Sequence, residues 1–291
     1  MSGGELLVVA LGGNAVSPPR GAPSFAVERQ LIGRAATELA PLARAGARLL
    51  VVHGNGPQVG RLLATEGRRS GRPRPAGGAD RRASSVTCSS RRWTPPRRRR
   101  ACVAVITRVV VAPDDAGFAT PTKPVGRVLA SAPAAPAIRV GDGWRRVVAS
   151  PRPLDVLELG RSAACWRPRT WSPAAAAGSP SPPARRARRS WTRTGPPRCW
   201  RRGSSARRLL YVTDVDAVYD DFGGADARRL SRLSVAEARA RVAAADFPAG
   251  SMGPKVASAT AFVAASGCPA VITTLGAVAA ALAGAAGTTI S

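Results

Sequence analysis

The sequence predicts an α/β fold with a mainly parallel sheet that is covered by helices on both faces. Short apolar runs typical of buried strands occupy residues 6–11, 48–52, 103–111, 209–213 and 270–273. Helical spacing of apolar residues is found at 26–45, 235–245 and 254–266, and a further helix is expected to begin at Gln58. Strands that alternate with helices favour parallel pairing, because a parallel connection has to cross over the sheet. Ligands of such folds gather at the carboxyl ends of the strands.

Length and composition indicate a soluble globular protein. The chain has 291 residues, 45% of them apolar, and no apolar run approaches the roughly 18 residues that a membrane span needs. Its five cysteines are odd in number and form no C-x-x-C pair, so neither a disulfide framework nor a zinc site is expected. No secretion signal is recognisable at the amino terminus. These observations predict a cytoplasmic protein that has no membrane partner.

The positive charge is concentrated in two segments, which we call the basic windows. The chain carries a net charge of +27. The first basic window, residues 67–100, has 12 Arg and one Asp, and the second, residues 161–206, has 11 Arg and no acid. Both are rich in Pro and Ser and lack the apolar period of a helix or a strand. The windows therefore differ from the α/β pattern of the remaining chain.

Two glycine-containing turns directly follow the first two predicted strands. The residues concerned are Gly12, Gly13 and Asn14 after the first strand and Gly54, Asn55 and Gly56 after the second. Glycines let backbone amides approach an anion closely, and the N-terminus of the following helix adds partial positive charge. Each turn is a candidate phosphate-binding loop, although a single turn of this kind is equally compatible with a tight connection that needs positive φ.

Lysine is almost absent, which draws attention to the two positions that keep it. The chain has 42 Arg but only two lysines, Lys123 in the segment PTKP and Lys255 in the segment GSMGPK. Both lie among glycines and prolines, as expected for turns. A compact ammonium on a thin side chain suits contacts that arginine cannot make, so both are candidate phosphate-binding residues. For one lysine alone, chance retention on a solvated loop would be the more common explanation.

Six segments form a recognisable set of motifs. They are residues 10–15 (ALGGNA), 53–60 (HGNGPQVG), 121–126 (PTKPVG), 145–153 (RRVVASPRP), 213–219 (TDVDAVY) and 249–255 (AGSMGPK). In that order they resemble the motifs of the carbamate kinases, a branch of the amino-acid-kinase superfamily. The glycine turns are shared across the superfamily, whereas the PTKP, RRVV-SPRP and GSMGPK segments resemble the carbamate enzymes specifically.

The resemblance implies reversible phosphoryl transfer between ATP and carbamate, in which carbamoyl phosphate and ADP yield ATP in arginine catabolism, the arginine deiminase pathway. It implies an αβα sandwich, the amino-acid-kinase fold, as a single domain over residues 1–291 with a small flap subdomain at about 112–150. Mg²⁺ is the expected cofactor, and a homodimer is the expected assembly. Such chemistry needs in-line positioning of the reactants and cancellation of phosphate charge.

The resemblance also implies roles for individual residues. Backbone amides of the two glycine turns would bind carbamate and the transferring phosphoryl group, with Gly12 and Asn14 at the reacting atoms. Lys123, on the flap, would close on the phosphoryl oxygens, and Lys255 would bind the ATP phosphates as a second catalytic lysine. The other expected nucleotide contacts are Thr213, Asp214, Val215, Tyr219, Met252 and Gly253.

Three conspicuous polar residues are expected to have simpler roles. His53, the only histidine, ends a strand and should form a hydrogen bond in the turn, because carbamate is already nucleophilic and needs no general base. Asp114 and Asp115 are expected to cap a turn rather than to bind a metal.

The basic windows stand where the family carries motifs that this chain lacks. Between Val111 and Thr213 the family has a GGGGIP turn and a DKD segment whose lysine bridges phosphates, and neither occurs here. With a suitable choice of GC-rich codons, a shifted reading frame can turn residues 171–181 into VAGGGGGIPV, 190–200 into LDKDRAAALL and 84–96 into VGDLLVEALDAA. We therefore predict that both windows are frameshifted translations, disordered or poorly packed, and that activity is impaired.

Two other functions stay open at the level of sequence. A sibling kinase that acts on UMP or an amino-acid carboxylate would share the glycine turns but would not need the PTKP and GSMGPK segments. A basic nucleic-acid-binding protein would use the arginines of the windows. The windows match no RNA or DNA module and do not regularly interleave aromatic with basic residues, so no specific nucleic-acid partner is expected.

Overall fold

The computed structural model describes residues 5–13, 25–53, 109–124, 128–156, 206–222, 224–244, 246–247 and 252–291. The main sheet consists of β1 (Leu6–Leu11), β2 (Arg48–His53), β8 (Ala206–Thr213), β11 (Arg232–Leu233), β12 (Ala270–Thr274) and β13 (Thr288–Ile290). The α-helices described are α2 (Phe25–Arg44), α6 (Val235–Ala243), α7 (Met252–Ser266) and α8 (Val278–Leu282). The smaller elements are β3 (Val109–Val111), η1 (Ala116–Phe118), β4 (Lys123–Pro124), β5 (Ala137–Val140), β6 (Gly143–Val148), β7 (Pro153–Val156), β9 (Val218–Asp220) and β10 (Arg228–Leu230).

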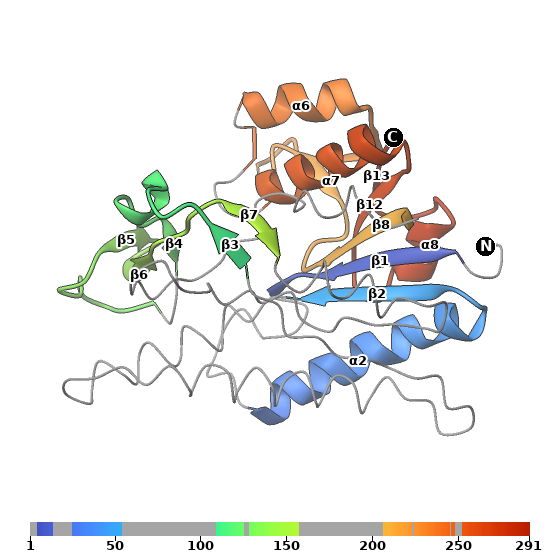
Figure 1. Ribbon diagram of the computed structural model, residues 1–291, viewed down its shortest axis with the longest axis horizontal. Coiled ribbons are helices and arrows are strands. Elements are labelled where there is room, and N and C mark those ends of the chain that lie inside the picture. The colour runs from blue at the N-terminus through green and yellow to red at the C-terminus, as the bar shows by residue number, and fades with distance from the viewer. Residues whose placement is uncertain are drawn as a thin grey trace.

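The central sheet has six strands in the order β11-β13-β12-β8-β1-β2 (Figure 1). β1 pairs in parallel with β2 and β8, and β8 pairs in parallel with β12. At the far edge β13 is antiparallel to β12 and parallel to β11. The predicted α/β fold with a mainly parallel sheet is therefore confirmed.

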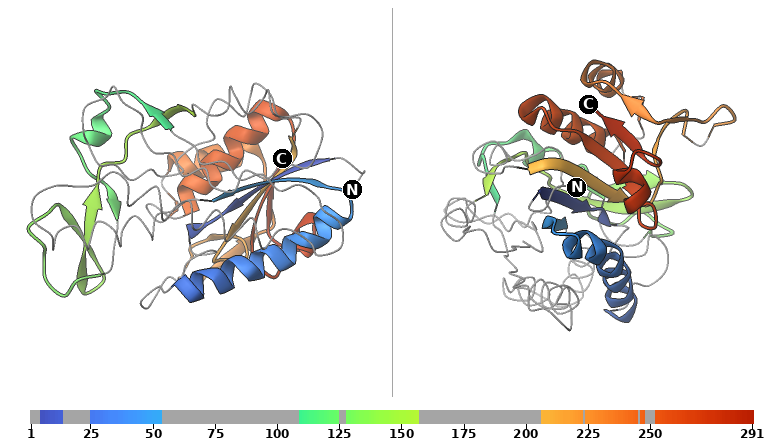
Figure 2. Two further views of the ribbon diagram at one scale, coloured as in Figure 1. Left: turned by 60° about the horizontal axis from the view of Figure 1, so that its bottom comes forward. Right: turned by 90° about the vertical axis from the view of Figure 1, so that its right-hand side faces the viewer.

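Helices cover both faces of this sheet, with α6 and α7 on one side and α2 and α8 on the other (Figures 1 and 2). Successive side chains of a strand point to opposite faces. Leu6 and Val8 of β1 accordingly join the apolar cluster under α7, whereas Leu7 and Val9 join the cluster under α2. All six residues of β1 are buried. Burial on both faces explains why the predicted strands are continuous apolar runs.

Hydrogen bonds to helix ends fix where the covering helices lie. At the start of α6 the Ser234 hydroxyl accepts from the amide of Glu237 at 3.2 Å, and the Glu237 carboxylate accepts from the amide of Ser234 at 2.7 Å. On the opposite side the Glu38 carboxylate of α2 accepts from the amide of Gly276 at 2.6 Å and from that of Val278 at 3.2 Å. Each pairing satisfies amides that have no partner inside the helix.

The predicted flap segment contains a separate three-stranded antiparallel sheet in the order β4-β6-β5. In Figure 1 this sheet and the β3–β7 pair lie beyond the end of the central sheet at which β1 and β2 terminate. Asp115 accepts from the amides of Gly117 at 2.7 Å and Arg152 at 3.1 Å, so it caps η1 and ties it to the segment before β7. The expectation that Asp115 caps a turn is confirmed.

Several predicted elements fall partly or wholly outside the described residues. Of the strand predicted at 103–111, only β3 lies within them, and the helix predicted to begin at Gln58 lies outside. Both basic windows also lie outside, except for Ala206, the first residue of β8. Within the described stretches, no helix is both long and apolar enough to cross a membrane.

Candidate functional site

Four strands of the central sheet end side by side at what we call the carboxyl edge. Leu11 of β1 pairs with His53 of β2 on one side and with Val212 of β8 on the other. Thr213, the last residue of β8, pairs with Thr274, the last residue of β12. The loops that leave these strands therefore start in one row, with about 4.8 Å between neighbours. Ligands of open parallel sheets bind outside such an edge.

Gly12 brings the first glycine turn against the end of β8. Its amide donates to the carbonyl oxygen of Val212 at 2.7 Å. A Cβ atom at Gly12 would lie 3.1 Å from that oxygen and 3.5 Å from the Cα of Thr213, so a larger residue would push the two segments apart. A Cβ atom at Gly13, in contrast, would meet no described residue within 4 Å. The first glycine therefore serves close packing against β8.

The other predicted residues of the glycine turns lie outside the described residues. They are Asn14, Gly54, Asn55 and Gly56. Their strands are described, and because Leu11 pairs with His53, both turns leave the sheet from neighbouring positions. His53 itself is buried. The two glycine turns thus start next to each other, as a shared anion site would need.

The segment that follows β8 bends beside Gly12. Thr213 is buried, and its hydroxyl donates to the carboxylate of Asp214 at 2.9 Å. Val215 packs against the apolar cluster under α7. The amide of Val218 donates to the hydroxyl of Thr288 at 2.8 Å, which attaches the far end of the bend to β13. The bend is held at both ends, with Asp214 at the carboxyl edge.

Tyr219 presents an aromatic ring just after this bend. Its hydroxyl donates to the two carboxylate oxygens of Asp216 at 3.1 and 3.2 Å, and this hydrogen bond raises the pKa of Tyr219 above its usual range. Its ring packs edge to face on Phe222, with 5.8 Å between the ring centroids. Phe222 is 56% exposed. Tyr219 therefore donates to Asp216 and forms an accessible aromatic surface with Phe222.

The start of α7 points toward the same edge. The hydroxyl groups of Tyr211 and Ser258 are hydrogen-bonded at 2.5 Å, which aligns the middle of α7 with β8 two residues before its end. Because α7 precedes β12, which runs parallel to β8, the helix runs against the strands and its first turn lies toward their carboxyl ends. That turn carries Met252, Gly253 and Lys255. The amide groups of a helix start and the Lys255 ammonium together favour an anion.

Lys123 is placed in a different body from the other predicted site residues. It belongs to β4 and pairs with Val148 of β6 in the three-stranded sheet. Gly12 contacts the end of β8, and the first turn of α7 lies toward the same edge. Lys123 belongs to β4, whose small sheet lies beyond that edge in Figure 1. Lys123 can contact a phosphate bound at the carboxyl edge only if the three-stranded sheet lies against that phosphate.

A cavity of about 710 Å³ lies between α2 and the loop that joins β12 to α8. It is lined by Ala26, Arg29, Gln30, Gly33, Arg34, Thr37, Glu38, Leu275 and Gly276. None of these is a predicted site residue, and Glu38 is already occupied as the cap of α8. The cavity therefore does not support the predicted phosphate site, and we assign no function to it.

Comparisons with known proteins agree on one family. The model of the "Amino acid kinase family" matches residues 5–130 and 203–274. A carbamate kinase of Halobacterium salinarum is 34% identical over 97% of this chain and 97% of its own length, and carbamate kinase 1 of Enterococcus faecium is 30% identical over 89% and 90%. The chain belongs to the carbamate kinases of the amino acid kinase family. The solved structure of the Giardia lamblia carbamate kinase bound to AMP-PNP covers 100% of this chain and 99% of its own, with 29% identity and a TM-score of 0.82.

Membership in the carbamate kinases explains the motifs and confirms the predicted amino-acid-kinase fold. The family match omits residues 131–202, which include most of the second basic window, but it runs through the first window. Sequence reasoning did not single out Asp216 and Phe222, which contact Tyr219, or Arg241, which contacts Asp220. Asp216 stands within the quoted TDVDAVY motif and could have been found there, whereas Arg241 gives no local signal because its partner is distant in the chain.

Proposed function

We propose that this carbamate kinase relative transfers a phosphoryl group reversibly between ATP and carbamate, with carbamoyl phosphate and ADP as the other pair of substrates. The observation that carries the proposal is the contact of Gly12 with the end of β8. This contact lies between the first glycine turn, which is the proposed anion-binding loop, and the Thr213–Asp214 bend. A phosphoryl group that moves between two reactants needs both binding regions within reach of one position.

The proposed division of work follows the carboxyl edge. Amides of the two glycine turns bind carbamate and the transferring group, and Asn14 lies at the reacting atoms. The bend after β8 with Tyr219, together with the start of α7, holds the nucleotide. Lys255 faces the nucleotide phosphates, and Lys123 meets the transferring group from the small sheet. Positive groups fixed in this way cancel charge on the transferring phosphoryl group without reorganisation.

Mg²⁺ is the proposed cofactor and enters with the nucleotide. Within the described residues no group of three or more His, Cys, Asp or Glu is arranged to hold a metal ion. Mg²⁺ is commonly held by one or two carboxylates together with substrate phosphates. Asp214, at the carboxyl edge, is the residue proposed to face it. The ion supplies neutralisation of phosphate charge.

We further propose that both basic windows are products of reading-frame shifts in a carbamate kinase gene, and that the chain as written is impaired. The absence of the DKD segment removes one expected phosphate-bridging lysine. Loss of one donor to a transition state lowers rates by about 10²- to 10³-fold. Assembly as a homodimer, and action in the cytoplasm in the direction of ATP formation, belong to the same proposal.

The test compares the chain as written with a chain in which both windows are restored to the shifted frame. ATP formation from ADP and carbamoyl phosphate should be readily measured in the restored chain and at least about 10²-fold slower in the chain as written, since one phosphate-binding donor alone contributes about 10²- to 10³-fold. UMP and free amino acids, each supplied with ATP, serve as the alternative acceptors. A restored chain that phosphorylates one of these but ignores carbamoyl phosphate would overturn the proposal in favour of a sibling kinase.

A separate measurement tests the origin of the windows. The gene is sequenced across codons 60–105 and 155–210, from independently prepared DNA. The frameshift proposal expects one insertion or deletion of nucleotides at each end of a window, relative to a frame that encodes the missing segments. An uninterrupted frame that encodes only the Arg-rich segments, with no such alternative, contradicts it.

A further inference from the structure

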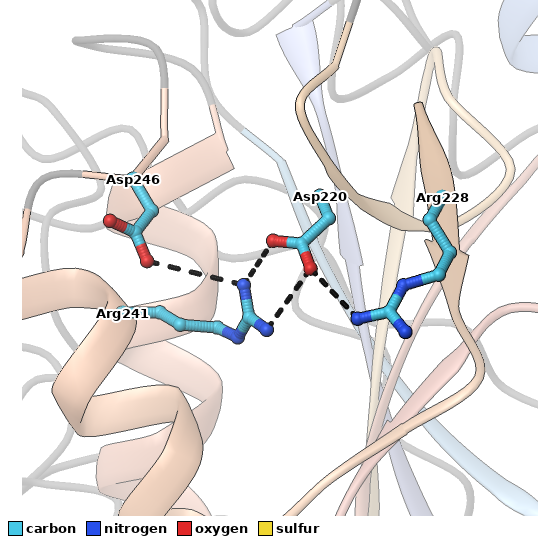
Figure 3. A network of polar contacts seen from close by, with 4 residues as sticks. All are labelled: Asp220, Arg228, Arg241 and Asp246. Atoms are coloured by element: carbon cyan, nitrogen blue, oxygen red, sulfur yellow. Dashed lines mark hydrogen bonds and ion pairs between the residues drawn. The ribbon is translucent and has the colours of Figure 1, made fainter. Parts of the chain in front are cut away.

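Arg241 of α6 is joined to the end of β9 by a two-pronged ion pair. Its two terminal nitrogens donate to the two carboxylate oxygens of Asp220, with Nη2 to Oδ2 at 3.2 Å and a shorter bond from Nη1 to Oδ1 (Figure 3). The Arg241 side chain is 25% exposed. Arg241 and then Arg228 hold the pKa of Asp220 below its usual range by donating to its charged form. Paired bonds of this type set direction as well as distance.

Asp220 also binds across its own hairpin. Arg228 of β10 stands directly opposite Asp220 of β9 and donates to its Oδ2 at 3.1 Å. The Arg228 side chain is 73% exposed, so this second pair is the weaker one. The Asp220 carboxylate therefore connects both strands of the β9–β10 hairpin to α6. Tyr219, the predicted nucleotide contact, is the residue that immediately precedes Asp220.

Arg241 faces a second acid on its other side. Its Nη1 lies 4.0 Å from Oδ2 of Asp246, which follows α6 on the way to α7 (Figure 3). The next residue, Phe247, is buried in the same apolar cluster as Met252, and its Cβ lies 3.5 Å from where a Cβ of Gly253 would be. The segment around Asp246 is therefore packed against the first turn of α7, which carries Lys255.

These contacts put Arg241 between the two segments that carry the nucleotide contacts. On one side Asp220 fixes the strand of Tyr219, and on the other Asp246 belongs to the segment that packs on the start of α7. We propose that Arg241 is a positioning residue that, through Asp220 and Asp246, sets the spacing between Tyr219 and the first turn of α7 and thereby the affinity for a nucleoside diphosphate. This inference rests on the proposed function, because it assigns these two segments to the nucleotide.

A role limited to holding α6 in place is less well supported. α6 already has a capping box at Ser234 and a fully buried Ala238 in the cluster under α7. The Arg241 network lies at the surface, where ion pairs add little to global stability. The distinctive property of this network is that the single guanidinium of Arg241 contacts Asp220 on β9 and Asp246 after α6. Loss of Arg241 should therefore change ligand affinity more than it changes unfolding.

The test measures ADP binding to the unmodified full-length chain by titration calorimetry, beside the variants Arg241→Gln and Asp220→Asn. Arg239→Gln is the matched control, since Arg239 is an exposed arginine of the same helix. Arg241→Gln should weaken ADP binding about tenfold, with little change in the thermal midpoint. The double variant Asp220→Asn with Arg241→Gln should lose little more ADP affinity than either single variant, because both substitutions break the same Arg241–Asp220 pair. Arg239→Gln should leave ADP affinity unchanged, and carbamoyl phosphate affinity should be unchanged in all variants.

The outcomes separate this inference from the proposed function. If neither the unmodified chain nor the chain with restored windows binds ADP, the proposed nucleotide site is wrong and the inference falls with it. If either form binds ADP and its Arg241→Gln variant binds equally well, the inference alone is overturned. If Arg241→Gln does not fold, Asp220→Asn decides, because it removes the charge while keeping the side-chain shape. Normal ADP affinity in folded Asp220→Asn then overturns the inference.

Discussion

The central sheet and the three-stranded sheet at the flap differ in how their strands are held. Every residue of β1 is buried between helices, whereas three of the four residues of β5 are exposed. The central sheet is thus fixed by packing on both faces, and the small sheet by its ladder hydrogen bonds and limited burial. Each body carries one of the two lysines, Lys255 on α7 and Lys123 on β4.

The two parts of the proposed site are therefore held with different rigidity: one lies on the buried central sheet, and the other on the more exposed small sheet. The carboxyl edge is built from strand ends whose spacing is set by the ladder and by the packing beneath it. The Lys123 side of the site depends on a small sheet with exposed apolar residues such as Ile138 and Val140. Substitutions that remove the same atoms should therefore have different effects in the two bodies.

The largest expected contrast is between Ile272→Ala in β12 and Ile138→Ala in β5. Ile272 is 0% exposed and Ile138 is 39% exposed. Removal of the buried side chain should lower the free energy of unfolding by about 2–5 kcal/mol, because it leaves a cavity. Removal of the partly exposed one should change it by less than about 1 kcal/mol. Urea unfolding of both variants measures this, and equal losses would contradict the contrast.

The two lysines offer the next test, in whichever form of the chain makes ATP from carbamoyl phosphate. Lys255→Ala and Lys123→Ala should each lower the rate by about 10²- to 10³-fold, because each removes a positive group from the phosphates. Lys255→Ala should also weaken ADP binding, whereas Lys123→Ala should lower kcat and leave ADP affinity unchanged. Steady-state kinetics with both substrates separates the two effects.

Lys255→Arg and Lys123→Arg are the matched controls for charge. If a thin ammonium is required, as the retention of only two lysines suggests, both arginine variants should lose most of the rate. Full activity of an arginine variant would contradict that requirement at its position. Unchanged activity of either alanine variant would remove that lysine from the site.

The smallest expected effect is acid loosening of α6. The pKa of Asp220 is lowered by Arg241 and Arg228, and the pKa of Glu237 is lowered by donation from the amide and hydroxyl of Ser234. Groups with a lowered folded-state pKa contribute stability above their unfolded pKa of about 4, and lose it as the pH falls through the folded value. The amides of α6 should thus keep their protection from hydrogen exchange at pH 5 and lose part of it near pH 3.

A variant that combines Asp220→Asn with Glu237→Gln controls for other acids. It should have weaker protection in α6 at pH 5 and little further loss at pH 3, since the titrating carboxylates are gone. Hydrogen exchange at both pH values, corrected for the intrinsic rate, measures the difference. A loss in the double variant as large as that in the unmodified chain would assign the acid effect to other groups.

Much of the central sheet could be predicted because its strands are buried on both faces and so are continuous apolar runs. β8 begins at Ala206, three residues before the predicted start. The prediction missed these residues because Arg207 and Arg208 interrupt the apolar pattern of the strand. Arg208 lies there with its guanidinium donating to the carbonyl of Leu282, a partner that no local pattern indicates. α7 begins at Met252 rather than Pro254, since a proline in the first turn lacks only an amide that would be unpaired anyway.

The amino-acid sequence alone was enough to predict β1, α2, β2, β8, α6, α7 and β12 in their order and to identify the family, because these depend on local apolar patterns and on motifs. It did not predict the short strands β4 to β7, β9 and β10, the edge strands β11 and β13, or α8. Three features follow from the folded structure alone. Gly12 touches the end of β8, the start of α7 lies toward the carboxyl edge, and Arg241 joins Asp220 to Asp246. Such pairs are set by strand order and helix packing, which bring together residues whose separation along the chain carries no signal.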